Sequence, residues 1–593
     1  MIRSMRRPGG SVSIGGRGGW RVRADGGAGR RWAVALTVVA AAVGGGVVEV
    51  GAQESRQNVR ERIGYGEAQR RMGRAMPSGL GVAFAHVEGS PGKYRPNLEG
   101  PNFETVAFSL RSGPSEPSPH ATAVGRVIYG SRGLAPGVEV VHCMTTQDFL
   151  GEGYLNAAST GPPGGDDGSP FPPRVMTHSW IADPPADQAA RILRRVDYQI
   201  DTRDVVMCVG VNNGRDRPVP ALLGSAHNVI AVGTTNGQSS GGFTRIEVPG
   251  RSKPDLVAPD GMTSFTTPVV SACAALLLEQ ADRLVEAGHP MANRSETIKA
   301  ALLGGAVKRE AWQVQPGRVL DEHLGAGEVN LDRSLRILDS APAVPGQPLR
   351  QLFGWSTVQL PGAQGETGQA SVVGYELELP VDVGPVTITA VWNRRIDGRL
   401  ANVIRREDQQ RFTVWLDAPR LANIDLRLWK LDEAGRVVAG ESAIDGDTPP
   451  AADAEAGDQD NVKTEVAAAD ANREPETAAG QAAADPADTE TEAGPAPLAA
   501  SLSTIDNVEL IHLPSLAAGR YRIELSRDPA LDPLPEAWDV ALAWTIDRAS
   551  TGSPAAEAEP SNSSESKTDT GADDPSDADP PTDIDTPDPA AIP

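Results

Sequence analysis

Four polar residues along the chain are of the types that nucleophilic catalysis requires. They are Glu88 after the apolar run 81–87, His120 at the start of HATAVGRVIYG, Asn212 in VGVNNG and Ser264 in DGMTSFTTPVVSA. A serine hydroxyl is a weak nucleophile and needs an imidazole to accept its proton, and the imidazole needs a carboxylate to fix its tautomer. A side-chain amide can donate to the oxyanion that such an attack creates. The residue types therefore allow a Ser-His-Glu triad with an amide donor, if the fold brings them together.

Short apolar runs alternate with amphipathic segments between residues 79 and 340, and near-continuous apolar runs suit strands that are buried on both faces of a parallel sheet. The runs occupy residues 81–87, 138–144, 174–180, 204–210 and 228–234. Residues 186–200 have the pattern of an amphipathic helix, and residues 267–287 that of a long buried helix opening at Pro268. The alternation predicts an α/β fold with a doubly wound, mostly parallel sheet. The working groups of such sheets gather beyond the carboxyl ends of the strands, where Glu88 and Asn212 stand.

The pattern changes at about residue 345, where every second residue becomes apolar. Residues 386–392, 424–431 and 520–525 show this alternation, which is typical of half-exposed antiparallel strands. We therefore predict an α/β domain over 79–340 followed by an antiparallel β-sandwich over 341–548.

The net formal charge of −23 comes from two acidic segments. Residues 441–500 hold 15 Asp or Glu against 2 Lys or Arg, and residues 551–593 hold 11 against 1, so the rest is formally neutral. The Ala- and Pro-rich composition of these segments cannot bury a core, and we predict disorder over 443–500, as an insert in the sandwich, and over the tail 549–593. A neutral folded part has no excess of basic residues for binding nucleic acid.

The N-terminus has the pattern of an export signal over residues 1–52. Arg-rich residues 1–31 precede the apolar run 32–48, and small residues at 50–52 offer a cleavage site. The alternative is a membrane anchor, because the run is about long enough to span a bilayer. Cleavage would leave a short N-terminal segment, 53–78, on an exported protein with no membrane segment.

Three cysteines, Cys143, Cys208 and Cys273, each lie in an apolar run. An exported protein stapled by disulfides would carry more cysteines, so we predict buried free thiols. None of the three has a neighbour in the sequence that would activate it as a nucleophile. The histidines other than His120 have no carboxylate or cysteine partner at metal-ligand spacing, and no metal site or cofactor is predicted.

Over about 260 residues the sequence resembles subtilisin-like serine peptidases, with several motifs in the order of that family. The runs KPDLVAPD (253–260) and MTSFTTPVVSACAALLLE (262–279) resemble its nucleophile region. SPHATAVGRVIYG (118–130) resembles its histidine motif, and VVMCVGVNNG (205–214) the strand and turn that hold its oxyanion asparagine. The sandwich resembles the C-terminal β-sandwich domains appended to secreted bacterial peptidases, most clearly over 503–525.

The resemblance implies roles for individual residues. Ser264 would be the nucleophile, His120 the general base, Glu88 the carboxylate behind it and Asn212 the oxyanion donor. Ser179 and Trp180, in Ser179-Trp180-Ile181, stand where the family has a Ser-x-Gly that lines the specificity pocket, so both are expected to bind substrate. Calcium sites are common in the family, but no loop has the ligand spacing of a recognised calcium motif.

Four departures from the family pattern leave alternatives open. Glu88 stands where Asp is usual, Met262 where Gly is usual and Ile181 where the pocket has Gly, and the stretch from 260 to Ser264 is short. Each site residue also has a structural interpretation: a helix cap for the serine, a turn for the asparagine, a surface loop for the histidine and a solvated strand end for the glutamate.

Two functions follow from these observations. The first is an exported, monomeric serine endopeptidase that cleaves proteins or peptides through an acyl-enzyme. The second is a subtilisin-type fold without turnover that serves as a binding or scaffold protein of the cell envelope.

Overall fold

The computed structural model describes residues 58–151, 154–155, 173–362, 370–404, 411–438 and 496–549. The predicted export signal 1–52 lies outside the described residues, as do nearly all of the acidic insert and the tail. Within the described ranges, no helix is both long enough and apolar enough to cross a membrane.

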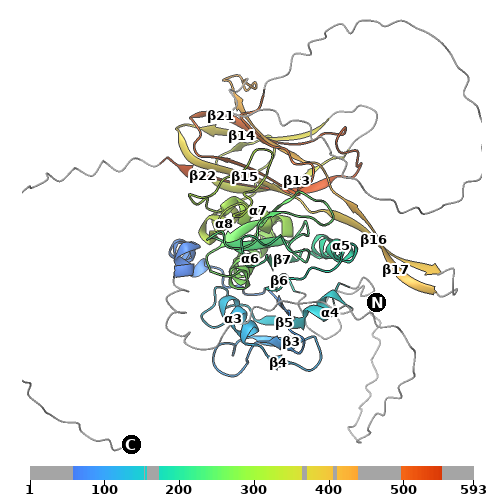
Figure 1. Ribbon diagram of the computed structural model, residues 1–593. Coiled ribbons are helices and arrows are strands. Elements are labelled where there is room, and N and C mark those ends of the chain that lie inside the picture. Colours follow the sequence, from blue (N-terminus) through green and yellow to red (C-terminus); the bar gives the residue numbers. More distant parts are fainter. Residues whose placement is uncertain are drawn as a thin grey trace, which may run out of the picture. The chain divides into compact units, whose positions relative to one another are not determined.

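A seven-stranded sheet forms the centre of the first half of the chain, in the order β11-β8-β7-β6-β1-β5-β3, and every neighbouring pair is parallel (Figure 1). Its strands are β1 (Phe84–Glu88), β3 (Ala107–Leu110), β5 (Val140–Thr145), β6 (Val175–His178), β7 (Val206–Gly210), β8 (Ile230–Thr234) and β11 (Leu256–Ala258). Four short strands flank it: β2 (Lys93–Arg95), β4 (Glu116–Pro117), β9 (Gly242–Phe243) and β10 (Ser252–Lys253). The five predicted strands coincide with β1, β5, β6, β7 and β8.

Alternate residues of the strands enter two separate hydrophobic cores. Phe84, Val206 and Cys208 belong to one core, whereas Ala85 and Met207 belong to the other. Helices cover both cores, which confirms the predicted doubly wound architecture. The helices are α2 (Tyr65–Met72), the 3-10 turn η1 (Gly73–Ala75), α3 (Pro119–Ile128), α4 (Thr146–Leu150), α5 (Ala186–Arg203), α6 (Thr263–Glu286), α7 (Ser295–Gly305) and α8 (Leu331–Leu338).

Helix α6 begins earlier than the sequence pattern predicts. The prediction started the helix at residue 267 with Pro268 opening it, but the first helical residue is Thr263 and Pro268 lies inside the helix. The carbonyl of Met262 accepts the N–H groups of Phe265 at 3.0 Å and Thr266 at 3.1 Å, and these bonds start the helix ahead of the proline. Ser264 is therefore the second residue of α6 and not part of a preceding loop.

The segment before β1 packs onto the α/β body. Ala68 of α2 is fully buried in the main core, and Arg71 forms an ion pair of 2.8 Å with Asp332 of α8. Glu279 near the end of α6 accepts the backbone N–H groups of residues 78–80 at 2.6 to 3.0 Å. The described part of the predicted N-terminal segment 53–78 is thus joined to the α/β core.

Two antiparallel-rich sheets form the predicted sandwich. One has the order β12-β14-β21-β18-β19 and the other β13-β22-β15-β20, with a shared apolar core between them. Their strands are β12 (Pro348–Leu349), β13 (Phe353–Leu360), β14 (Ser371–Leu379), β15 (Val383–Val391), β18 (Asp425–Leu431), β19 (Ala499–Ser501), β20 (Val508–Leu513), β21 (Gly519–Arg527) and β22 (Trp538–Arg548). Because β19 pairs with β18, the predicted end of the disordered insert at residue 500 is too late.

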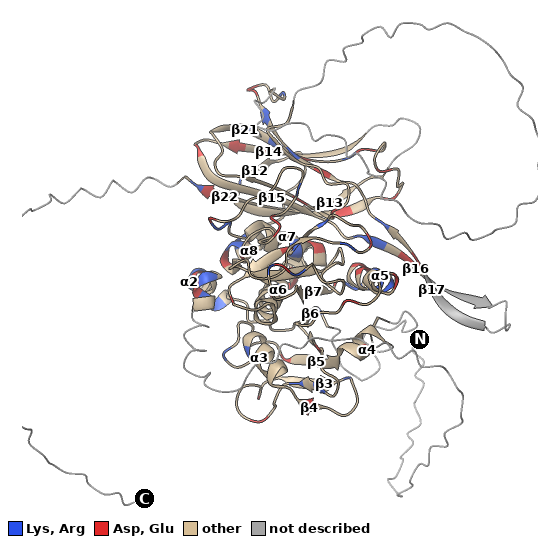
Figure 2. Cartoon of the chain, in the orientation of Figure 1, with Lys and Arg blue, Asp and Glu red and all other residues tan. Residues whose placement is uncertain are grey.

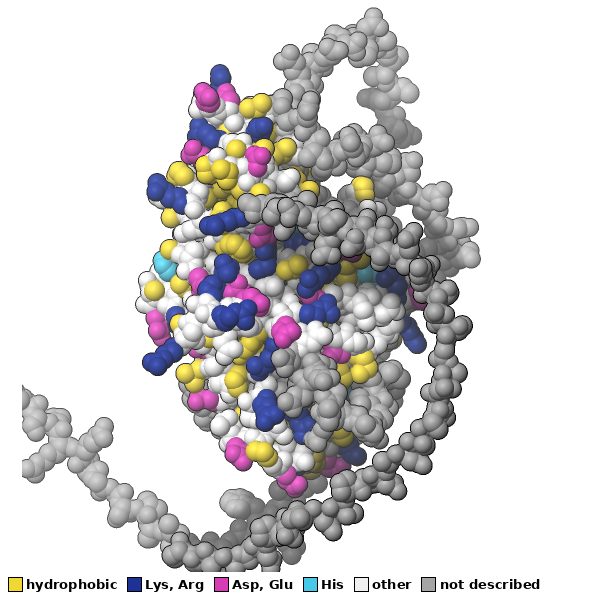
Figure 3. Space-filling view, turned by 90° about the vertical axis from the view of Figure 1, so that its left-hand side faces the viewer, with side chains coloured by type: hydrophobic (Ala, Val, Ile, Leu, Met, Phe, Trp, Pro, Cys, Tyr) yellow, Lys and Arg dark blue, Asp and Glu magenta, His cyan; other side chains and the backbone are white. Residues whose placement is uncertain are grey.

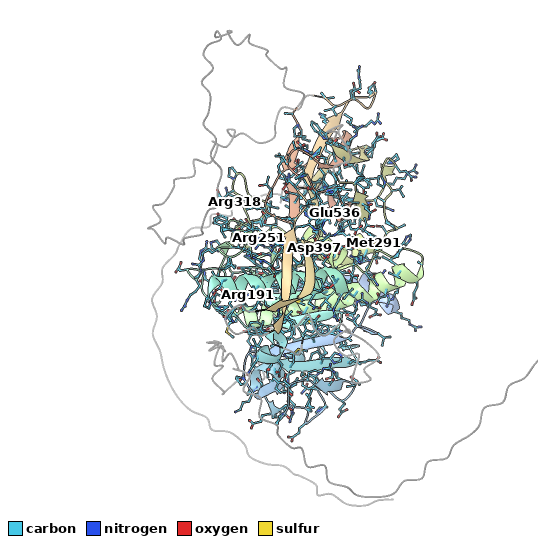
Figure 4. All side chains as sticks on the ribbon, turned by 90° about the vertical axis from the view of Figure 1, so that its right-hand side faces the viewer. Arg191, Arg251, Met291, Arg318, Asp397 and Glu536 are labelled. Atoms are coloured by element: carbon cyan, nitrogen blue, oxygen red, sulfur yellow. The ribbon has the colours of Figure 1, made fainter. Side chains whose placement is uncertain are left out.

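A two-stranded hairpin, β16 (Arg395–Ile404) and β17 (Arg411–Arg420), extends from the sandwich past α5 (Figure 1). At the base of the hairpin, Arg420 forms ion pairs with Asp397, at 2.7 Å, and with Glu536. Asp397 and Glu536 lie near one another in Figure 4. Arg194 of α5 binds Asp417 of β17 at 2.8 Å. These ion pairs tie the base of the hairpin to both halves of the molecule.

Helices α7 and α8 lie between the sandwich and the rest of the α/β body (Figure 1), and apolar residues of the sandwich, among them Val391 and Ala543, join the main core. Beside this apolar contact, Arg394 of the sandwich is 3% exposed and binds Asp197 at 3.3 Å and Glu247 at 2.6 Å. Arg251 is also buried, with 1% of its surface exposed, and it lies below the sandwich in Figure 4. The sandwich is therefore attached through a buried network of charges as well as through apolar packing.

Charged side chains of both signs are interspersed over the elements (Figure 2) and over the face shown in Figure 3. This distribution fits the neutral formal charge of the folded part and differs from the one-sided basic surface of a nucleic-acid-binding protein.

Candidate active site

Glu88 is the last residue of β1, and His120 is the second residue of α3. Ser118 caps α3 by accepting the N–H of Ala121 at 3.1 Å, which fixes the first turn and the position of the imidazole. His120 Nδ1 lies 2.9 Å from both carboxylate oxygens of Glu88. The Glu88 side chain is buried, so the structural alternative of a solvated strand-end charge does not describe it.

The buried pair has shifted pKa values. Burial disfavours the charged form of each group, but the hydrogen bonds and charges that the two exchange outweigh it. The pKa of Glu88 is lowered, with His86 adding a second hydrogen bond, and the pKa of His120 is raised by Glu88. Glu88 is therefore an anion at neutral pH, and it holds the Nδ1–H tautomer of His120, whose Nε2 is then the basic atom.

A second imidazole binds the same carboxylate from inside the fold. His86 Nε2 lies 3.0 Å from Glu88 Oε1, and its Nδ1 lies 2.7 Å from the hydroxyl of Tyr129. Both side chains are fully or almost fully buried. No sequence pattern predicts a role for these two residues, since neither their spacing nor their types mark them as a pair.

Ser264 lies at the start of α6, beside α3. The two helices pack together, and the ring of Phe265 lies 6.4 Å from that of His120. Thr263, the first helical residue, donates its N–H to Asn213 Oδ1 at 2.9 Å, and the next two N–H groups after Ser264 bind Met262. Among the described residues, the N–H of Ser264 has no hydrogen-bond partner, so this donor at the positive end of the helix is available to an anion.

No hydrogen bond joins Ser264 Oγ and His120 Nε2 within the part of the chain that the structure describes. In unliganded hydrolases such contacts are often long and tighten when substrate binds. The structure thus brings Glu88 and His120 into direct contact and sets Ser264 on the neighbouring helix.

Ser179 contacts the backbone of Ser264. Its Oγ donates to the carbonyl of Ser264 at 3.1 Å. That carbonyl would normally accept the N–H of residue 268, four positions on, but Pro268 has none. Ser179 therefore supplies the donor that the proline lacks.

Trp180 does not line a substrate pocket as the sequence analysis expected. Its ring is 4% exposed, belongs to the core on the α5 side of the sheet, and donates through Nε1 to His178 Nδ1 at 3.2 Å. An apolar ring with one N–H is well satisfied in such a site, where it is removed from water and still hydrogen-bonded. The predicted contact of this side chain with substrate is therefore corrected to a place in the core.

Asn212 follows β7, next to the start of α6. Its Nδ2 donates to the carbonyl of Pro218 at 2.8 Å, and its backbone N–H binds Ser240 Oγ at 3.0 Å. A primary amide has two N–H groups, and the bond to Pro218 uses one. The next residue, Asn213, accepts the N–H of Thr263 and thereby anchors the start of α6.

A cavity of about 350 Å³ is lined by Arg215, 235–237, Ala311, Gln313, Gln315 and 321–324, and none of Glu88, His120, Asn212 and Ser264 lines it. Among the described residues no group of three or more His, Cys, Asp or Glu is placed to hold a metal ion. Cys143, Cys208 and Cys273 are buried free thiols, as predicted.

No protein-family model matches the chain, and no curated protein matches it either. Several solved structures of proteases are similar to part of the chain. The patellamide maturation protease PatA is 20% identical, with 44% of this chain and 97% of that chain covered and a TM-score of 0.30. A lanthipeptide protease is 16% identical (48% and 95% covered, TM-score 0.33), and proteases from Pseudoalteromonas arctica are 15% identical (48% and 97% covered, TM-score 0.30).

Proposed function

We propose that the chain is a serine endopeptidase that cleaves peptide bonds through an acyl-enzyme on Ser264. The observation that carries the proposal is the contact of His120 Nδ1 with both oxygens of the buried Glu88, beside α6, whose second residue is Ser264. A buried carboxylate that orients an imidazole next to a serine is the arrangement that activates a hydroxyl.

In the proposed first step, Ser264 Oγ attacks the carbonyl carbon of the scissile bond while His120 Nε2 takes the hydroxyl proton. The negative charge on the former carbonyl oxygen is met by the N–H of Ser264 and by the second N–H of Asn212. The C–N bond then breaks, the imidazolium gives its proton to the leaving amine, and Ser264 carries the acyl group. Glu88 stabilises the imidazolium throughout and remains an anion.

The second half of the reaction repeats these roles with water. His120 removes a proton from a water molecule whose oxygen attacks the acyl carbon, and the resulting imidazolium returns the proton to Ser264 Oγ as the acid product leaves. The atoms balance as peptide plus water giving an acid and an amine. No metal or cofactor takes part, and we expect the rate to be insensitive to chelators.

The glutamate in place of aspartate fits this proposal. Glu88 ends its strand deep in the site, and the additional methylene of glutamate lets the carboxylate reach Nδ1 of His120 from there. Met262 likewise does not hinder the start of α6, because its backbone is extended and its carbonyl begins the helix.

Hydrolysis of unstructured protein tests the proposal. The purified, processed chain is incubated with reduced, alkylated casein, and peptide products are identified by mass spectrometry. We expect new fragments with the wild type and none with Ser264→Ala. Equal fragmentation by both proteins would assign the cleavage to a contaminant and overturn the proposal.

The alternative, a binding or scaffold module without turnover, is favoured by one observation: the amide of Asn212 already donates to Pro218. Under that alternative, neither casein cleavage nor labelling of Ser264 by a serine-reactive probe would occur. We further propose export with removal of residues 1–52; a mature N-terminus near Gln53, found by N-terminal sequencing of the exported protein, would support it, and an intact residue 32–48 run would favour the anchor.

A further inference from the structure

We propose that His86 and Tyr129 are positioning residues that lock the glutamate of the site in its working rotamer. The inference deepens the proposed function and rests on it, because positioning matters only if Glu88 serves His120. One carboxylate oxygen contacts both imidazoles: Glu88 Oε1 lies 3.0 Å from His86 Nε2 and 2.9 Å from His120 Nδ1.

The chemistry of Tyr129, His86 and Glu88 determines which of them donates in each of the two hydrogen bonds that join them. Burial raises the pKa of Tyr129 well above its ordinary value, so its hydroxyl keeps its proton and can donate to His86 Nδ1. With Nδ1 accepting from Tyr129, the N–H of the His86 ring is on Nε2 and donates to the carboxylate. The opposite tautomer would set a lone pair of His86 against an anionic oxygen. Tyr129 therefore selects the tautomer of His86, and His86 donates to Glu88.

A glutamate carboxylate depends on a hydrogen bond such as the one from His86 more than an aspartate carboxylate does. Its side chain has one more rotatable bond, so its carboxylate can leave the imidazole by a rotation that an aspartate lacks. Thr146 Oγ1, which binds at 2.9 Å, holds only the backbone carbonyl of Glu88. His86 is thus the partner, besides His120, that fixes the carboxylate itself.

A glycine in α3 leaves room for the Tyr129 side chain that binds His86. A Cβ added to Gly125 of α3 would lie 2.8 Å from the hydroxyl of Tyr129 and 2.9 Å from two of its ring carbons. The absence of a side chain at Gly125 therefore lets the tyrosine fold back beneath its own helix and reach β1. The rings of Phe84, Phe103 and Phe108 pack around it at centroid distances of 5.7 to 6.3 Å.

Other titratable groups surround His86 but do not replace it. On β5, Cys143 is its register partner, and on β6, Thr177 is its partner and His178 follows. Burial and the nearby His86 lower the pKa of His178 to about 3, and burial raises the pKa of Cys143, so both are neutral at physiological pH. The charge of Arg95 acts on Cys143 and opposes the effect of burial on the pKa of that thiol. Glu88 is the one anion that contacts the ring of His86 among the described residues.

The experiment compares four variants with the wild type by the rate of labelling with a fluorophosphonate probe. His86→Leu removes both ring nitrogens at similar bulk, His86→Gln keeps an N–H donor at about the position of Nε2, and Tyr129→Phe removes one hydroxyl. Tyr154→Phe is the matched control, because its buried hydroxyl has no partner in the described chain. We expect His86→Leu to slow labelling by about 10²-fold, the scale of misplacing a working group. Tyr129→Phe should slow it less, His86→Gln should recover part of the loss, and Tyr154→Phe should match the wild type.

A second measurement separates positioning from loss of structure and does not need turnover. In histidine-selectively ¹⁵N-labelled Ser264→Ala protein, the titration of His120 is followed by NMR with and without His86→Leu. We expect the pKa of His120 to fall toward its ordinary value when Glu88 is released. Slower labelling with an unchanged pKa of His120, or labelling of His86→Leu at the wild-type rate, would overturn the proposal. An unlabelled wild type whose His120 still responds to His86→Leu would instead overturn the peptidase function and leave the positioning role standing.

Discussion

Ser179 Oγ donates a hydrogen bond of 3.1 Å to the backbone carbonyl of Ser264. The bond fills the place of the helical N–H that Pro268 cannot supply, and it joins the end of β6 to the first turn of α6. The position of the proposed nucleophile is thus set by the helix on one side and by Ser179 on the other.

We predict that Ser179→Ala slows probe labelling of Ser264 by about 10- to 10²-fold, because the first turn of α6 shifts when its carbonyl loses the donor. The cost in folding stability should be near 1 kcal/mol, the usual cost of one hydrogen bond. Ser271→Ala is the control, since that hydroxyl binds Thr267 O within the same helix at 2.9 Å and does not touch Ser264. Equal labelling rates in both variants would show that Ser179 has no part in placing the nucleophile.

The carboxylate is predicted to be indispensable. Glu88→Gln keeps the length of the side chain but loses the charge that fixes the tautomer of His120, so turnover of a peptide substrate should fall by about 10⁴-fold. Glu88→Asp keeps the charge but shortens the side chain that reaches His120. The turnover of this variant should therefore also fall well below that of the wild type. Glu116→Gln, on exposed β4, is the control. Retention of the wild-type rate by Glu88→Gln would remove this residue from the mechanism.

The rate should depend on the protonation of His120. Because Glu88 raises the pKa of His120 above its ordinary value of 6.5, the imidazole is charged and cannot act as a base below that pH. The labelling rate is therefore expected to rise with pH through a midpoint above 6.5 and to level off beyond it. In Glu88→Gln the residual rate should still rise with pH, but through a lower midpoint than in the wild type. A wild-type midpoint well below 6.5 would contradict the charged contact with Glu88.

Asn212 is expected to act on the transition state. Asn212→Ala should lower kcat by about 10²- to 10³-fold, the scale of a lost oxyanion donor, with little change in KM. Asn213→Ala, which removes the acceptor for Thr263, should weaken the start of α6 and lower thermal stability as well. A change confined to KM in Asn212→Ala would argue for contact with the bound substrate and against an oxyanion role.

Arg394 is predicted to secure the sandwich. Its guanidinium is buried between Asp197 and Glu247, and its backbone exchanges hydrogen bonds of 2.8 Å with Asn228. Arg394→Met takes the guanidinium away from the buried Asp197 and leaves Glu247 with Arg194 as its ion-pair partner, and about 3–5 kcal/mol of stability should be lost. Thermal unfolding by calorimetry measures the loss. Arg436→Met at an exposed ion pair is the control, and equal stability of the two variants would contradict the buried network.

The sequence predicted the architecture well where hydrophobic pattern alone decides it. Strands buried on both faces, such as Val206–Gly210, are continuous apolar runs, and the predicted ends lie within three residues of the observed ones. The edge strands Ala107–Leu110 and Leu256–Ala258 were missed, because the first is half-exposed and the second has three residues.

The site was predictable as a set of residues but not as a set of contacts. Glu88 and His120 came from residue types and motif order, and their contact depends on a glutamate rotamer that spacing cannot reveal. The early start of α6 depends on Asn213 and Ser179, which are distant in the chain and have no sequence signal linking them to Thr263 or Ser264. Trp180 was misplaced because its motif position suggested a pocket, whereas His178 offers its indole a buried acceptor.

The most direct test of the account is covalent labelling of the intact protein by a fluorophosphonate between pH 6 and 9, read by mass spectrometry of the whole chain and of its peptides. We expect one adduct per molecule, located on the peptide that contains Ser264, and no adduct in Ser264→Ala. Absence of labelling in the folded wild type across this range, or an adduct that persists in Ser264→Ala, would contradict it.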